Sequence, residues 1–154
     1  MATVYSDVGT IQSSTNPETK AALNPLSISS LIQADTLVTI SATADAADVV
    51  RLVKVPAGYR LLPEYVRIYA EDPGTTLTVD IGDDDATTAV DADRYVDGLD
   101  ISAGGTFVGS TAPGVALFAR YTLQAQSWIT LTYATAATLT SGAKIRVSLI
   151  FAKI

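Results

Sequence analysis

Apolar and polar residues alternate with a period of two in several short runs from residue 36 onward. In the clearest run, residues 76–82, Leu77, Val79 and Ile81 occupy alternate positions. This spacing is typical of a β-strand with one face in a core and the other toward water. Comparable runs, some less regular, lie at residues 37–42, 48–55, 64–70, 114–121, 128–134 and 144–151.

Turn-forming residues separate these runs. Proline and glycine mark turns at residues 56–58, 73–74 and 113–114, and Ser-Gly marks another at 141–142. Seven or eight short strands, with no amphipathic helix after residue 36, predict an all-β, antiparallel β-sandwich. We favour a jelly-roll-like arrangement over residues 36–154, although the number of strands does not determine their connectivity.

The first 35 residues differ from the rest of the chain. Fourteen of them are Ser, Thr, Asn or Gln, their pattern is aperiodic, and two Asn-Pro steps favour extended or turn conformations. We expect residues 1–35 to form an extended N-terminal arm, with a leader lacking fixed structure as the alternative. Fully extended, the arm would reach about 115 Å at ~3.3 Å per residue.

Composition excludes several classes of function. The chain contains neither cysteine nor histidine, which removes disulfides, the usual zinc sites and catalytic triads that contain histidine. No apolar run approaches the ~18 residues of a membrane span, and the N-terminus lacks the pattern of a signal peptide. We therefore expect a protein that is synthesised in the cytoplasm, does not associate with membranes and is not an enzyme.

The net charge of −6 is distributed unevenly. Residues 71–100 contain ten acids and one base, whereas residues 101–154 contain four bases and no acid. The acidic total argues against nucleic acid as a partner, since phosphate binding requires a concentrated cationic face. The asymmetry instead suggests that oppositely charged parts of two chains meet across a subunit contact.

The aspartates between residues 80 and 100 allow three interpretations. A calcium site would use several carboxylates on one loop, but the spacing matches no EF-hand, so we assign no metal or other cofactor. A glycosidase would require a buried pair of acids, with Asp84, Asp85 or Asp93 as candidates. The run D-D-D at residues 83–85 predicts exposure to water rather than burial.

The third interpretation, which we favour, is structural. The segment would form an ordered acidic loop in which Arg94 joins two carboxylates and Tyr95, Val96 and Leu99 pack against the sandwich. The residues assigned to this loop are Asp80, Asp83, Asp91, Asp93, Arg94 and Asp97.

Four motifs together resemble small head-associated proteins of tailed bacteriophages, which include capsid decoration, or cement, proteins. They are V-P-A-G at residues 55–58, T-L-T-V-D-x-G-D at 76–83, D-A-D-R-Y-x-D-G-L-D at 91–100 and I-T-L-T at 129–132. The resemblance covers about two thirds of the chain, mostly residues 52–151.

This resemblance implies a structural virion protein on the capsid exterior. Such a protein would bind the major capsid protein at junctions between capsomers, associate as a homotrimer and stabilise the expanded lattice. A receptor- or glycan-binding module of a head fibre or tail is the alternative. The arm would supply the capsid contacts, for which the apolar candidates are Val4, Tyr5, Leu23, Leu26 and Ile28.

A second set of residues is proposed for contacts between subunits. If Val66 and Ile68 face the core, the opposite face of that strand presents Tyr and Arg side chains, a composition favoured in interfaces. Each aromatic candidate is also compatible with ordinary packing inside the sandwich. The candidates are Tyr65, Arg67, Tyr69, Phe118, Tyr121 and Trp128.

Overall fold

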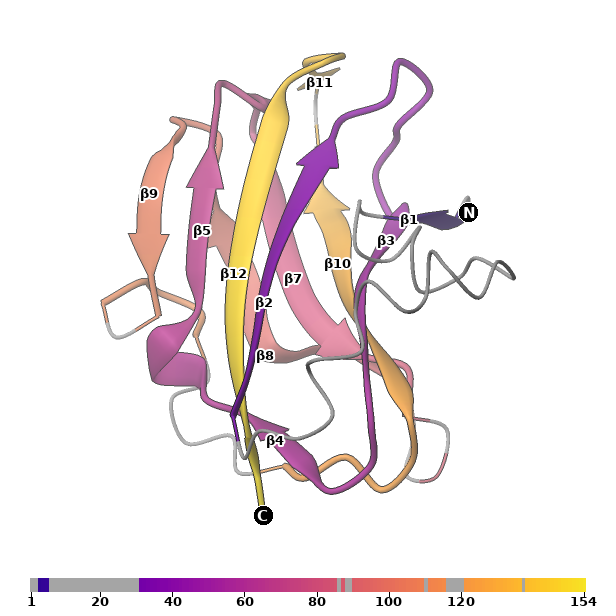
Figure 1. Ribbon diagram of the computed structural model, residues 1–154. Helices are drawn as coiled ribbons and strands as arrows, with labels where there is room; N and C mark the ends of the chain where they lie inside the picture. The colour runs from indigo at the N-terminus through magenta and orange to yellow at the C-terminus, as the bar shows by residue number, and fades with distance from the viewer. Residues whose placement is uncertain are drawn as a thin grey trace.

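Two β-sheets packed face to face make up the body of the chain (Figure 1). The computed structural model describes the backbone of residues 3–5 and residues 31–85, 87, 90–109, 111–115, 121–136 and 138–154. Sheet A has the strand order β1-β3-β10-β7-β8, and sheet B has the order β2-β12-β5-β9, with β4 also paired to β12. A short pair, β11-β6, lies outside both sheets.

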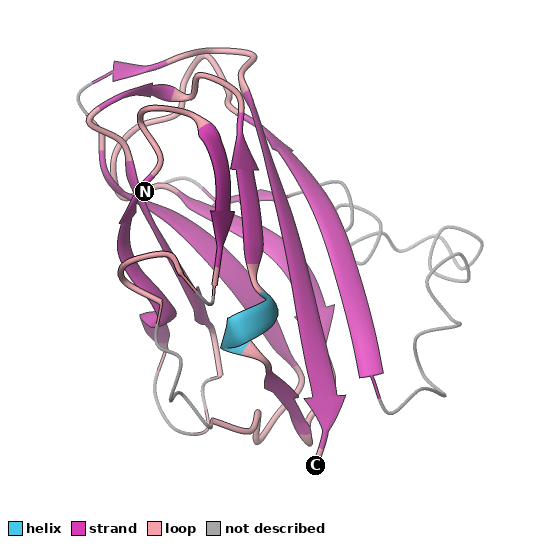
Figure 2. Cartoon of the chain, turned by 90° about the vertical axis from the view of Figure 1, so that its left-hand side faces the viewer, coloured by secondary structure: helices cyan, strands magenta, loops and turns pink. Residues whose placement is uncertain are grey.

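The strands have the following bounds. Sheet A consists of β1 (Thr3–Tyr5), β3 (Val49–Val55), β7 (Thr78–Asp83), β8 (Asp91–Asp100) and β10 (Ser127–Thr135). Sheet B consists of β2 (Leu31–Thr39), β4 (Tyr59–Leu61), β5 (Arg67–Ala70), β9 (Gly105–Val108) and β12 (Lys144–Lys153). The short pair is β6 (Gly74–Thr75) and β11 (Thr138–Leu139), and the 3-10 helix η2 (Pro63–Tyr65) precedes β5, as Figure 2 shows.

The order in which the strands pair defines a jelly roll. The antiparallel pairs are β2 with β12, β3 with β10, β5 with β9, and β7 with β8. In the sequence, each of these pairs lies inside the previous one: β3 and β10 lie between β2 and β12, and β5 and β9 lie between β3 and β10. The innermost pair is β7 with β8. This nested pairing, divided between two sheets, is the jelly-roll arrangement. It confirms the predicted all-β sandwich and decides the connectivity that strand count left open.

Alternate residues of the predicted strands face the shared core. On β7 and β10, the positions predicted to be buried are almost entirely inaccessible, and the same holds on β12. Burial of apolar surface stabilises a fold by roughly 25 cal/mol per Å², so this core is the main source of stability. Its members on these strands are Val79, Ile81, Ile129, Leu131, Tyr133, Ile145, Val147, Leu149 and Phe151.

The first strand of the sandwich begins earlier than the alternation suggested. Strand β2 starts at Leu31 and pairs with β12 from Leu31–Ala152 to Thr39–Lys144. The polar residues Gln33 and Asp35 occupy its outward positions, which made this segment look like part of the arm.

The beginning of the chain also returns to the sandwich. Strand β1 pairs in parallel with β3, from Thr3–Val49 to Tyr5–Arg51. Residues 6–30, which connect β1 to β2, lie outside the described residues.

The acidic segment D-A-D-R-Y-V-D-G-L-D is a strand and not a loop. It forms β8 at the edge of sheet A, antiparallel to β7. Two register shifts in this pairing place Tyr95 and Val96 both inside, which hides the period of two. At the second irregular stretch, Gly98 has a positive φ of 63°, and its N–H donates to the Asp80 carboxylate at 2.7 Å. The expected burial of Tyr95, Val96 and Leu99 is confirmed.

Other predicted runs differ in smaller ways. The run at residues 64–70 opens with η2, so its strand is limited to β5. Of the run at residues 114–121, Val115 forms an isolated bridge with Val96, and residues 116–120 lie outside the described residues. The edge strand β9 was not predicted because its sequence, G-T-F-V, is too short to show a period. Among the described residues, no helix is long and apolar enough to cross a bilayer.

Candidate functional site

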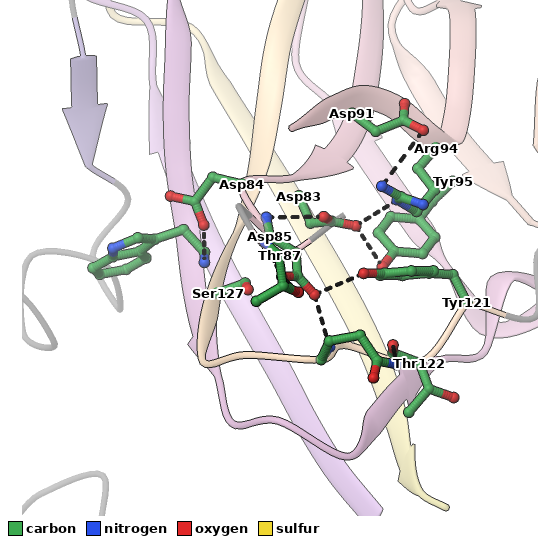
Figure 3. Close-up of polar contacts among 12 residues, drawn as sticks. Asp83, Asp84, Asp85, Thr87, Asp91, Arg94, Tyr95, Tyr121, Thr122 and Ser127 are labelled. Carbon is green, nitrogen blue, oxygen red and sulfur yellow. Dashed lines mark hydrogen bonds and ion pairs between the residues drawn. The ribbon is translucent and has the colours of Figure 1, made fainter. Parts of the chain in front are cut away.

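Three consecutive aspartates lie where β7 ends and the chain turns toward β8. We expected the run to be exposed to water, but Asp83 and Asp85 are completely inaccessible. Asp84 points to the other side and stays partly accessible, with 28% of its side chain exposed. The expectation was wrong because hydrogen-bond donors from β8 and from residues 121–128 surround the two buried carboxylates (Figure 3).

The Asp83 carboxylate lies inside the sandwich and joins β7 to β8. Its Oδ2 accepts a hydrogen bond from the Tyr95 hydroxyl at 2.8 Å and faces Arg94 Nε at 2.8 Å. Its Oδ1 accepts the Asp85 backbone N–H at 3.1 Å. Burial raises the pKa of Asp83, and the hydrogen bond from Tyr95 and the positive charge of Arg94 offset this only in part. Burial and the negative Asp83 also raise the pKa of Tyr95, so its hydroxyl keeps the proton that it donates.

Arg94 connects the acids at the end of β7 to those of β8. Its guanidinium pairs with Asp83 and, at 3.6 Å, with Asp91, so it joins two carboxylates as the sequence suggested. Its central carbon lies 3.8 Å from the centroid of the Tyr121 ring. A buried carboxylate is tolerated when a charge of opposite sign and hydrogen bonds compensate it. Arg94 therefore makes the burial of Asp83 possible.

The Asp85 carboxylate is saturated with donors. Its Oδ1 accepts the backbone N–H and the hydroxyl of Thr87. Its Oδ2 accepts the Tyr121 hydroxyl and the Gln124 backbone N–H, both at 2.7 Å. Burial by itself raises the pKa of Asp85, but these hydrogen bonds outweigh it and hold the pKa below its usual range. Asp85 thus ties the end of β7 to the segment before β10 as a permanent anion.

Asp84 serves the outer side of the same corner. Its Oδ1 accepts the Trp128 backbone N–H at 2.6 Å, and its Oδ2 lies 3.7 Å from Arg51. Arg51 and Lys54 lie 5.7 Å from the centroid of the Trp128 ring, which is only 8% exposed. The three aspartates together hold β3, β7, β8 and β10 in register at one end of sheet A.

The other acids of the predicted loop lie on β7 and β8, the last two strands at one edge of sheet A. Asp93 and Asp97 are exposed on β8, and Asp80 and Asp91 are half-buried. A hydrogen bond with Asp91, together with burial and the nearby negative charge, raises the pKa of Asp93. In the part of the chain that the structure describes, no group of three or more acids is arranged to hold a metal ion.

The outer face of sheet B presents the predicted surface of Tyr65, Arg67 and Tyr69, which we call the Tyr65–Tyr69 surface. Val66 and Ile68 are buried, whereas Tyr65 and Tyr69 are 54% and 50% exposed and Arg67 points outward with them. The cross-strand register places Tyr69 beside Arg146 of β12. Leu31, at the start of β2 in the same sheet, is also exposed. Half-exposed tyrosines beside arginines are typical of protein–protein interfaces.

A hollow of about 280 Å³ lies on this face. Arg67 forms part of its lining, together with Gln33, Tyr65, Ser148 and Ile150. Nearby, the exposed Asp35 carboxylate is engaged by Arg146 at 3.2 Å and by the Ser148 hydroxyl at 3.1 Å. Among the described residues, Arg67 has no carboxylate within ion-pair distance. We call these five lining residues the Arg67 hollow.

The remaining candidates are placed as follows. Tyr121 and Trp128 take part in the internal packing described above and do not join the Tyr65–Tyr69 surface. Val4 and Tyr5 lie on β1, where the backbone pairs with β3. Phe118 and the arm candidates Leu23, Leu26 and Ile28 lie outside the described residues.

These observations define the chain as a jelly-roll protein with closed internal acids and two accessible surfaces. The described residues form a jelly-roll β-sandwich whose buried acids are occupied by internal donors and are closed to solvent. General acid–base catalysis requires an acid that a substrate can reach, and neither Asp83 nor Asp85 is accessible. The accessible features are instead the outer face of sheet B and the acidic edge of β8.

Solved structures with the same fold come from phage capsids. A chain in the capsid of Ralstonia phage GP4 matches with a TM-score of 0.71 at 16% identity, over 99% of each chain. A chain of the cyanophage Pam1 capsid asymmetric unit matches with a TM-score of 0.60 at 20% identity, over 80% of this chain and 85% of that one. A chain of the acid-stable capsid of Helicobacter pylori bacteriophage KHP30 gives a TM-score of 0.52 at 16% identity, over 80% and 88%.

At these identities the likeness shows a shared fold. No protein-family model matches the chain, and no curated protein matches it. The function must therefore be argued from the fold and its exposed surfaces.

Proposed function

We propose that this chain is a structural protein of a tailed-phage virion that binds the outer surface of the capsid as a decoration, or cement, protein. The observation that carries the proposal is the fold shared over nearly the full length with a chain in the GP4 capsid. The same fold recurs in chains from two further phage capsids. No other class of protein is suggested by the acids, since the buried ones are engaged internally.

The proposed mechanism is mechanical. A protein that binds only the expanded shell stabilises it by mass action, and several copies acting together bind more tightly than one copy. In this proposal the sandwich is the rigid body, the N-terminal arm contacts the major capsid protein, and the Tyr65–Tyr69 surface joins subunits of a homotrimer. The rigidity needed for this role is supported by the buried network at Asp83 and Asp85.

The arm contact can be tested on the full-length chain. We expect the triple substitution Leu23→Ser, Leu26→Ser and Ile28→Ser to abolish co-sedimentation with heads of the encoding phage prepared without this protein. The substitutions remove apolar side chains that would be buried against the capsid. Ile154→Ser is the matched control, because Ile154 is an exposed apolar residue at the other end of the chain.

Three outcomes separate the alternatives. Retained binding by the triple variant, with the control unchanged, contradicts the arm contact. Failure of the unmodified chain to bind these heads contradicts the cement function. Binding of the purified chain to host cells or glycans in the absence of any capsid would instead favour a receptor-binding module of a fibre or tail.

A further inference from the structure

The outer face of sheet B carries an unbalanced positive charge. Its outward cations are the half-buried Arg60 on β4, Arg67 on β5, and Lys144 and Arg146 on β12. Asp35 is already engaged by Arg146, and Glu71 follows β5 at the rim, where its backbone N–H bonds to the Lys144 carbonyl. Arg67, in its hollow, is thus the cation best placed to receive a carboxylate from outside.

The complementary charge lies on the same chain. Strand β8 ends sheet A and exposes Asp93, Asp97 and Asp100, whereas its cation, Arg94, is turned inward to Asp83. Among the described residues, neither Asp93 nor Asp97 forms an ion pair. Within the described residues, the outer side of β8 is contacted by residues 114–115, where Val96 bridges to Val115 and the Asp97 N–H donates to the Gly114 carbonyl at 2.8 Å. In the part of the chain that the structure describes, the side chains of Asp93 and Asp97 are therefore exposed acids without a paired cation.

One molecule cannot bring these two surfaces together. The cations lie on the outward face of sheet B, and β8 is the edge strand of the opposite sheet, behind β5 in Figure 1. A contact between them must join two copies through different surfaces on each copy. Such head-to-tail contacts close into a ring when the rotation between copies allows it.

We propose that a second copy of the chain covers the outer face of sheet B, with the acidic edge of its β8 seated against the Arg67 hollow. This deepens the subunit contact of the proposed function by naming the partner of the Tyr65–Tyr69 surface. Arg67 would receive Asp93 or Asp97 of the next copy as a two-pronged hydrogen-bonded pair. Tyr65 and Tyr69 would flank that pair and shield it from water.

A second copy is favoured over an unrelated acidic partner by the distribution of charge along the chain. The chain concentrates its acids in residues 71–100 and has none in residues 101–154, so each copy offers one surface of each sign. The exposed acids of β8 also have a simpler role, since charges on an edge strand prevent edge-to-edge pairing. That simpler role predicts a monomer, which makes the two explanations distinguishable.

The experiment uses full-length chains and measures their mass by sedimentation velocity across a range of concentrations. We expect the unmodified chain to associate, and both Arg67→Ala and the double variant Asp93→Asn/Asp97→Asn to weaken association at least tenfold. All of the replaced side chains are exposed, so the folded state should be kept. Lys153→Ala, an exposed cation near the C-terminus, is the matched control and should associate normally.

Mixing the two variants gives the decisive result. The Arg67→Ala chain keeps its acidic edge and the Asp93→Asn/Asp97→Asn chain keeps its hollow, so one intact head-to-tail contact forms between them. We expect 1:1 dimers in the mixture and monomers in each separate sample. Raising the salt concentration from about 0.05 M to 0.5 M should weaken the formation of these dimers, because the two charged surfaces are exposed before they meet and salt screens their attraction.

Several results would overturn the inference. They are an unmodified chain that stays monomeric, association that neither variant weakens, and association that depends on Arg67 but not on β8. The last of these would assign the hollow to a different acidic partner. A monomeric chain that still co-sediments with phage heads would overturn the self-contact and leave the capsid function standing.

Discussion

At the scale of single residues, the most informative feature is the pair of buried carboxylates at Asp83 and Asp85. The two are chemically identical and two positions apart, yet burial raises the pKa of Asp83 while hydrogen bonds lower that of Asp85. The difference lies in the donors, because Asp85 accepts four hydrogen bonds through its two oxygens. Each carboxylate is a cross-link between segments distant in sequence.

The donor pattern predicts unequal effects of two similar substitutions. Asp85→Asn replaces one oxygen with an NH₂ group, which cannot accept the two donors that meet each oxygen. We expect a loss of about 2 kcal/mol or more at pH 7. Asp83→Asn should cost less, because the protein already disfavours the charged form at that position. Urea unfolding followed by the fluorescence of Trp128, the one tryptophan of the chain, measures both. Equal losses of unfolding free energy in the two variants would contradict the different roles given to Asp83 and Asp85.

The same residues predict how stability depends on pH. The pKa of Asp85 is lower in the folded chain than in the unfolded chain, so its contribution is present above the ordinary aspartate value of about 4 and is lost as pH falls below it. Asp83 contributes to the pH dependence with the opposite sign. Its pKa is raised by burial, so protonation at low pH removes the cost of burying its charge. We expect Asp85→Asn to flatten the loss of stability between about pH 5 and pH 2, and Asp83→Asn to retain it. Urea midpoints at several pH values check this.

At the scale of elements, strand β8 is the least regular part of the sandwich and carries its acidic edge. Its pairing with β7 contains two register shifts, and the backbone at Gly82 passes close to the Asp91 carbonyl. A β-bulge bends a strand and redirects its side chains. Here the irregular pairing lets Tyr95 reach Asp83 while Asp93 and Asp97 stay outside.

The close approach of the two strands yields a prediction for glycine. A Cβ at Gly82 would overlap the carbonyl oxygen of Asp91, so Gly82→Ala should separate β7 from β8 and cost about 2 kcal/mol or more. Amide hydrogen exchange should accelerate along β8 before it does along β12. Gly142→Asn is the control, because Gly142 has open space around it and asparagine tolerates its positive φ of 83°. Unchanged protection of β8 in Gly82→Ala would contradict this account.

At the scale of the whole molecule, the residues that stabilise the jelly roll differ from the residues proposed to contact other proteins. The core lies between two sheets and includes residues from nearly every long strand. The proposed contacts lie on the outer face of sheet B, on the edge of β8 and in the N-terminal arm. A rigid body with several independent contact surfaces suits a protein that must hold neighbours together.

The cement function predicts a change in the phage head. Heads saturated with the chain should release their DNA at a higher temperature than heads without it, because bound protein stabilises only the intact lattice. The gain should rise with the logarithm of the free protein concentration once binding is nearly complete. Release of DNA can be followed with an intercalating dye during heating. Identical release temperatures at saturating protein would contradict a cement role.

Much of this molecule could be predicted from its sequence. The strands with a clear period of two, such as Leu77–Ile81 and Ile145–Leu149, are local patterns, and their burial follows the pattern. The outward placement of Tyr65, Arg67 and Tyr69 followed from the same reasoning. The strand β8 did not, because its register shifts break the period and its aspartates resemble a loop.

The alternation of side chains thus determined the class of fold, since it states which face of each strand must leave water. The tertiary structure alone decided the jelly-roll connectivity and the fate of the D-D-D run. An isolated aspartate prefers water, and its burial becomes favourable only when donors from distant segments converge on it. For Asp83 and Asp85 the donors come from Tyr95, Tyr121 and Gln124 and the compensating charge from Arg94, which no local pattern brings together.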